Sequence, residues 1–62
     1  MSDKRVIIEF VKVGAYVKVS AIDPTTRVEV SIVGDPSMSQ ATLERTAVRK
    51  LKYVLHKRKE ID

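Results

Sequence analysis

Hydrophobic and polar residues alternate in the first half of the chain and recur with a helical period in the second. Three segments rich in β-branched residues, 6–13, 16–22 and 27–33, are bounded by turn-forming residues, a pattern typical of β-strands. Residues 38–59 contain neither Gly nor Pro, and their apolar positions fall on one helical face. The pattern predicts an α+β fold, in which a three-stranded antiparallel meander precedes one C-terminal helix packed on one face of the sheet (β-β-β-α).

Two connections predict how the strands pair. Gly14-Ala15 suits a two-residue type II′ turn, because glycine readily adopts the positive φ that this turn requires. In residues 23–26, Asp in the first turn position and Pro in the second favour a type I turn within a four-residue loop. These loops predict the pairs Val13–Tyr16, Phe10–Val19, Ile8–Ala21, Ile22–Arg27, Val19–Val30 and Val17–Ile32.

This register separates the strand residues into an apolar face and a mixed face. The apolar face collects Val6, Ile8, Phe10, Val17, Val19, Ala21, Val28, Val30 and Ile32, with Lys12 at its rim. The mixed face places Glu9, Ser20 and Glu29 in one row. On the helix, an apolar stripe of Leu43, Ala47, Val48, Leu51, Val54 and Leu55 is expected to cover the apolar face. Ser37 and Gln40 have the spacing of a capping box, and Ser39 is the alternative N-cap.

Length and composition limit the classes of protein to consider. Sixty-two residues are expected to form one domain, residues 1–62, and the absence of cysteine excludes disulfides and thiolate metal sites. Small domains without such links often gain stability by self-association. No segment is long and apolar enough for a signal peptide or a membrane span. We therefore expect a cytoplasmic protein.

The net charge of +4 comes entirely from the C-terminal segment that contains the predicted helix. Residues 1–39 hold five basic and five acidic side chains, whereas residues 40–62 hold seven basic and three acidic ones. Five of the basic or titratable residues step by four, three, four and three positions and lie opposite the apolar stripe: Arg45, Arg49, Lys52, His56 and Lys59. Such a stripe can bind the phosphates of a nucleic acid, contact an acidic protein, or simply be a solvated helix face.

The mixed face of the sheet is a second candidate surface. It is too apolar to face water entirely and too charged to be a core, and the first strand is apolar on both sides although it lies at an edge. Exposed apolar edges tend to pair with other strands. We expect a homodimer formed through the first strand or through this face, using Ile7, Val11, Val13, Tyr16, Ile22 and Val33.

Catalytic machinery is not apparent in the sequence. His56 is the only histidine; Glu60, four residues later, could contact it, but both positions are expected to be exposed, which is a weak signal for catalysis. The serines lack a nucleophile elbow, and the two glycines do not form a phosphate-binding or dinucleotide-binding signature. We expect no enzyme activity, cofactor, metal or small-molecule substrate.

Three stretches of the chain, Val13–Pro24, Glu29–Gly34 and Ala47–Leu55, together carry a resemblance to a known family. They resemble a family of short alphaproteobacterial proteins that is classed as a domain of unknown function. Some of its members carry a serine hydroxymethyltransferase label, which this chain is too short to support. The resemblance implies a bacterial cytoplasmic protein and brings no functional residues.

The order of elements is also similar to the C-terminal part of double-stranded RNA-binding domains. Gly34, Ser37 and Ala41 match the start of the last helix in that family. Its lysine cluster falls here on Met38, Ser39 and Thr42, however, and its first helix is missing.

The leading hypothesis is a small non-enzymatic binding or interaction module that self-associates. The alternative is a nucleic-acid-binding accessory protein that uses the basic helix stripe.

Overall fold

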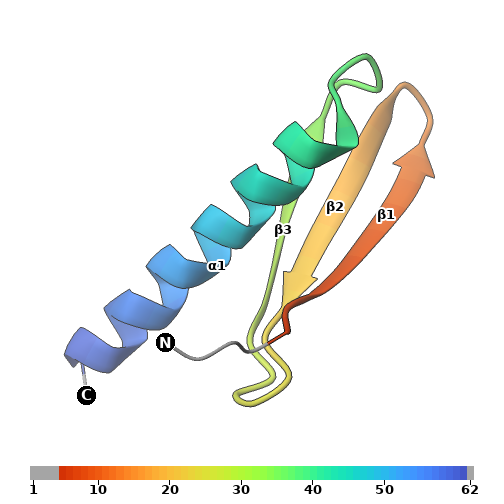
Figure 1. The fold of residues 1–62 in the computed structure, drawn as a ribbon. Helices are drawn as coiled ribbons and strands as arrows, with labels where there is room; N and C mark the ends of the chain where they lie inside the picture. Colours follow the sequence, from red (N-terminus) through yellow and green to blue (C-terminus); the bar gives the residue numbers. More distant parts are fainter. Residues whose placement is uncertain (1–4, 62) are drawn as a thin grey trace.

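A computed structural model describes residues 5–61, including the side chains of residues 5–58. Strands β1 (Ile7–Val13), β2 (Tyr16–Ile22) and β3 (Glu29–Gly34) form an antiparallel sheet in the order β1-β2-β3. Helix α1 (Gln40–Ile61) follows and packs against β2 and β3 (Figure 1). The predicted β-β-β-α fold is therefore confirmed.

The first hairpin has the predicted register. Val13 is opposite Tyr16, Phe10 is opposite Val19, and Ile8 is opposite Ala21. Gly14 has a φ of 59°, whereas Ala15 keeps a negative φ, as the type II′ turn requires. A two-residue loop whose first position needs positive φ leaves little freedom in the pairing, so this prediction is confirmed in detail.

The predicted register of the second hairpin is wrong by two residues. Ile22 is opposite Glu29 rather than Arg27, and Val19 is opposite Ile32 rather than Val30. The loop has four residues as expected, but it spans 24–27 instead of 23–26. Asp23 and Val28 close it, with the Asp23 N–H donating to the Val28 carbonyl at 2.9 Å. The third strand consequently runs from Glu29 to Gly34, not over 27–33.

Asp23 and Arg27 explain the later start of this loop. The Arg27 N–H donates to the Asp23 carbonyl at 2.7 Å, and Arg27 adopts a φ of 67°. The buried Asp23 carboxylate accepts hydrogen bonds from the Thr26 N–H at 3.3 Å and the Thr26 hydroxyl at 2.8 Å. Asp23 thus closes the loop as its last paired residue, and Arg27 supplies the left-handed turn that returns the chain to the sheet.

The two-residue shift leaves the faces of the sheet as predicted, because side chains alternate with a period of two. The core lies between the sheet and the stripe on α1, and consists of Val19, Ala21, Val30, Leu43, Ala47 and Leu51. Partly buried Val6, Ile8, Val17, Val28, Ile32, Val54 and Leu55 pack around it. The row beside Glu9 does change: Ser20 is opposite Ser31, not Glu29.

Helix α1 begins at Gln40, two residues later than predicted, and extends to Ile61. Ser39 is the N-cap, since its Oγ accepts a hydrogen bond from the Thr42 N–H at 3.1 Å. Ser37 instead belongs to the preceding turn, where its N–H donates to Asp35 Oδ1 at 2.8 Å. Ser39, the alternative N-cap in the sequence analysis, is therefore the cap of α1.

Candidate interaction surfaces

Strand β1 is exposed on both of its faces. On the face that α1 covers, the Phe10 side chain is 37% exposed, because the helix packs over β2 and β3. On the opposite face, Ile7 and Val11 are about half exposed, at 47% and 49%. Figure 1 shows β1 as the edge strand that lies farther from the helix. The strand with the most apolar sequence is thus the least covered of the three.

The backbone of β1 also directs N–H and C=O groups away from β2, at the outer edge of the described sheet. Val13 and Tyr16 close a two-residue turn, and such closing residues form a hydrogen-bonded pair. Hydrogen-bonded and non-hydrogen-bonded pairs alternate along an antiparallel ladder. The N–H and C=O groups of the odd-numbered residues therefore face β2, whereas those of Ile8, Phe10 and Lys12 point outward.

The outer edge of β3 differs, because a side chain binds one of its outward carbonyl groups. Asp23 and Val28 are hydrogen-bonded, so alternation along β2 and β3 directs the carbonyl of Ser31 away from β2. Lys50 Nζ, from α1, donates to that carbonyl at 2.8 Å. Lysine side chains are one means by which proteins block edge strands. Among the described residues, the outer edge of β1 has no side-chain bond of this kind.

The face of the sheet opposite α1 is the predicted self-association surface. Ile7, Val11, Val13, Tyr16 and Val33 are exposed there, and Val33 reaches 65%. Ile22 is half-buried. Ser20 lies in the middle of this face and is only 5% exposed, and its hydroxyl hydrogen-bonds to that of Ser31 at 3.2 Å. The structure therefore places the six predicted residues on one side of the sheet, among the charged residues Glu9, Lys18 and Glu29.

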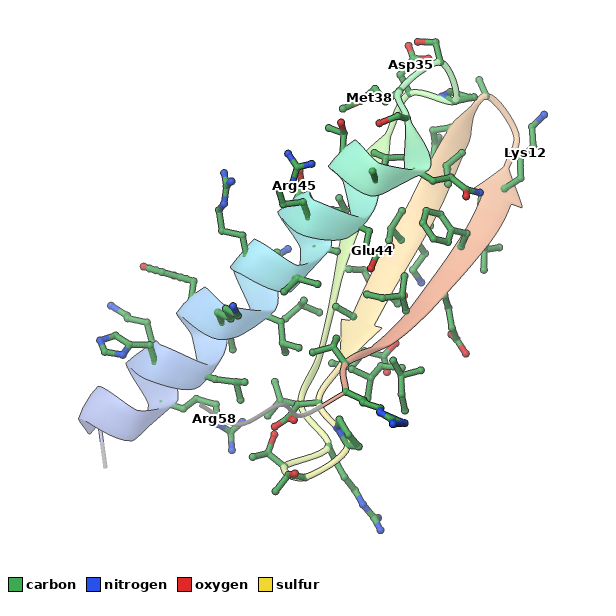
Figure 2. The ribbon with its side chains drawn as sticks, viewed as in Figure 1. Lys12, Asp35, Met38, Glu44, Arg45 and Arg58 are labelled. Carbon is green, nitrogen blue, oxygen red and sulfur yellow. The ribbon has the colours of Figure 1, made fainter. Side chains whose placement is uncertain are left out.

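A shallow hollow lies along α1, lined by Ala41, Glu44, Arg45 and Val48. Glu44 and Val48 lie on one flank of the buried helical stripe, and Lys50, which reaches β3, lies on the other. Glu44 and Val48 are thus on the flank nearer to β1, and Figure 2 shows Glu44 on that side of the helix. Part of the lining of the hollow therefore lies on the flank of α1 nearer to β1, the strand that carries Phe10.

The basic stripe occupies the side of α1 away from the sheet. Arg45, Arg49, Lys52 and His56 are exposed, and Figure 2 shows Arg45 pointing away from the strands. The side chain of Lys59, the fifth predicted member, lies outside the described residues. Next to the stripe, Lys57 Nζ is 5.9 Å from the centre of the exposed Tyr53 ring, within the range of a cation–π interaction.

In the described part of the chain, the titratable groups do not form a metal-binding cluster, and the Asp35 carboxyl has a shifted pKa. Residues 5–58 hold no cluster of three or more His, Asp or Glu side chains that could bind a metal ion. Hydrogen bonds from the backbone N–H and side chain of Ser37 lower the pKa of the fully exposed Asp35 carboxyl. The hydrogen bonds that cause this pKa shift are part of the turn before α1. Among the described residues, no helix is both long and apolar enough to cross a membrane.

Comparisons with known proteins identify the family of the chain. The sequence profile of a family described as Domain of unknown function (DUF6898) matches residues 3–59. No curated protein matches the chain, and neither does any solved structure. Since the profile covers nearly the whole sequence, the chain belongs to the DUF6898 family.

Proposed function

We propose that this protein is a non-enzymatic interaction module that self-associates by pairing strands at the outer edge of β1. The observation that carries the proposal is the state of β1, which has exposed apolar side chains on both faces and outward backbone groups. A strand with these properties is a template for another strand. Pairing would satisfy its backbone and reduce the exposure of Phe10 and Val11 along this edge.

Two features favour the β1 edge over the other surfaces. At the outer edge of β3, Lys50 already binds the outward carbonyl of Ser31. The open face carries the exposed charges Glu9, Lys18 and Glu29, and face-to-face stacking would desolvate them at a substantial free-energy cost. Edge pairing leaves those charges in water. We therefore place the contact at the edge rather than on the face, the two routes that the sequence left open.

Sedimentation equilibrium with two lysine variants tests this choice. The wild-type chain is expected to sediment as a dimer, and Phe10→Lys is expected to be monomeric because its charge would lie at the paired edge. Val33→Lys is the matched control, since Val33 is more exposed but lies on the open face and on the opposite edge strand. It should remain dimeric. A monomeric wild-type protein at high concentration would refute self-association, and a monomeric Val33→Lys with a dimeric Phe10→Lys would move the contact to the open face.

A second candidate function is binding to nucleic acid through the basic stripe. The observation that favours it is the exposure of Arg45, Arg49, Lys52 and His56 along one side of α1. Side chains spaced along a helix can neutralise successive phosphates. If all five predicted residues contact duplex phosphates, the logarithm of affinity should fall with the logarithm of salt concentration with a slope of about −4.5.

Charge reversal separates specific contact from net charge. Arg49→Glu with Lys52→Glu should abolish binding to a DNA or RNA duplex in a mobility-shift assay at low salt. Lys18→Glu with Arg27→Glu changes the net charge by the same amount on the sheet and its loop, and should retain most of the binding. Absence of a mobility shift with the wild-type chain would exclude this function, and equal losses in both variants would reduce it to a net-charge effect.

A further inference from the structure

Resting on the proposed self-association, we infer that the second copy pairs antiparallel with β1 in one register, with Phe10 opposite Phe10. The product is a continuous six-stranded sheet whose two-fold axis passes between the two Phe10 residues. The axis is perpendicular to the sheet, so the two α1 helices lie on the same side of it. Symmetric pairing of identical surfaces is the commonest form of homodimer.

The outward backbone groups limit the possible registers. Ile8, Phe10 and Lys12 present the free N–H and C=O groups, so even-numbered residues must form the hydrogen-bonded pairs of a new ladder. A two-fold axis perpendicular to the sheet keeps each face continuous, so even residues pair with even ones and odd with odd. The registers that preserve a substantial overlap are centred on Glu9, Phe10 or Val11.

Charge and strand length distinguish these three registers. Centring on Glu9 would place two carboxylates directly opposite each other, an unfavourable cross-strand pair. Centring on Val11 would pair only residues 9–13 and set Phe10 against a lysine, Lys12 of the second copy. Centring on Phe10 pairs the whole of β1, Ile7–Val13, and opposes Glu9 to Val11. Only this register combines full overlap with separated carboxylates.

The side chains on the helix side agree with the same register. Phe10 extends the row of Val19 toward the edge, but it lies beyond the cover of α1 and remains 37% exposed. Two Phe10 rings meeting at the axis would continue the core from one copy to the other. Lys12 would lie opposite Ile8, where its aliphatic stem can cover that side chain while its ammonium stays in water.

Cysteine cross-linking reads out the register directly, because the chain has no cysteine of its own. In the inferred register, Glu9 and Val11 of different copies are a non-hydrogen-bonded pair with Cα atoms about 4.5 Å apart, within the range for a disulfide. Glu9 to Glu9 and Val11 to Val11 are diagonal, at about 8 Å, which is beyond that range. Both side chains are exposed, and Phe10 is left unchanged.

The experiment uses Glu9→Cys and Val11→Cys chains that differ in size by a tag, oxidised separately and after mixing under reducing conditions. The mixture should give at least tenfold more cross-linked product than either variant alone, and the product should be the heterodimer. The inferred register would be overturned if Glu9→Cys alone, or Val11→Cys alone, cross-linked as efficiently as the mixture. A wild-type dimer whose variants do not cross-link in the mixture would overturn it too, while leaving self-association intact. A monomeric wild-type chain would refute both proposals.

Discussion

At the scale of single residues, the two glycines act for different physical reasons. Gly14 adopts a φ of 59° in the turn, but a Cβ there would meet no atom within 4 Å. Gly34 closes β3, and a Cβ there would overlap the Cδ2 atom of Leu43, which is buried in the core. One position is thus restricted by its backbone conformation and the other by packing.

Alanine substitutions at these glycines should separate the two effects. Gly34→Ala is expected to reduce the free energy of unfolding by about 1–3 kcal/mol, because Leu43 must move within a packed core. Gly14→Ala meets no clash and should lose about 1 kcal/mol through its left-handed backbone. Urea unfolding followed by circular dichroism gives both values. A negligible loss in Gly34→Ala would show that packing around Leu43 is looser than the structure indicates.

Asp35 should titrate below the ordinary range of an aspartate. The Ser37 N–H and, to a smaller extent, the Ser37 side chain stabilise its charged form and lower its pKa. The folded-state pKa is depressed, so this stabilisation is present above the unfolded pKa of about 3.9 and is lost as pH falls through the folded value. An NMR titration should place the pKa of Asp35 below that of an unfolded aspartate. Ser37→Ala should raise it only in part, since the backbone donor remains; an unshifted pKa in the wild-type chain would contradict the turn geometry.

At the scale of the elements, turn chemistry decided how much of the sheet could be predicted. Glycine at residue 14 made the first hairpin unambiguous. In the second hairpin, Pro24 marked a turn correctly, but nothing in an arginine side chain signals that Arg27 adopts a φ of 67°. The register was therefore wrong by two residues, while the buried face was right because an even shift preserves alternation.

Arg27 offers a direct test of this loop. Arg27→Gly should raise the free energy of unfolding by up to about 1 kcal/mol, because relief of the left-handed strain outweighs the extra entropy of the unfolded chain. Thr25→Gly is the matched control in the same loop, and because Thr25 has a negative φ it should lower stability by about 0.5–1 kcal/mol. Thermal unfolding of both variants compares them. Destabilisation by both glycines would mean that Arg27 is not in the left-handed region.

The candidate edge could be predicted from the sequence only in outline. Apolar residues on both sides of the first strand indicated an exposed edge. The outward carbonyl of Ser31 at the other edge is bound by Lys50, one of seven basic residues after residue 39, and this bond depends on how α1 lies across the sheet. The position of α1 over β2 and β3 also leaves Phe10 exposed, although the sequence assigned it to the covered face. These features arise from tertiary packing, which periodicity does not encode.

At the scale of the whole molecule, a single helix is too narrow to cover three strands. The buried core side chains come from α1 and from β2 and β3 beneath it, whereas the residues of β1 remain exposed or half-buried. A chain of this size buries a limited fraction of its surface. A second copy at the β1 edge would add apolar burial where the monomer lacks it. Self-association and stability should therefore be coupled.

This coupling predicts that the thermal midpoint depends on protein concentration. If unfolding of the dimer yields two unfolded chains, a tenfold rise in concentration stabilises the dimer by about 1.4 kcal/mol, which corresponds to roughly 5 °C for two chains of this length. Calorimetry of the wild-type chain over a hundredfold concentration range should show this increase, and Val33→Lys should retain it. Phe10→Lys should unfold at a lower midpoint that is independent of concentration, because the substitution removes the paired state and leaves only the stability of a single sheet under a single helix. A constant wild-type midpoint would show that one copy of the chain supplies all of its own stability.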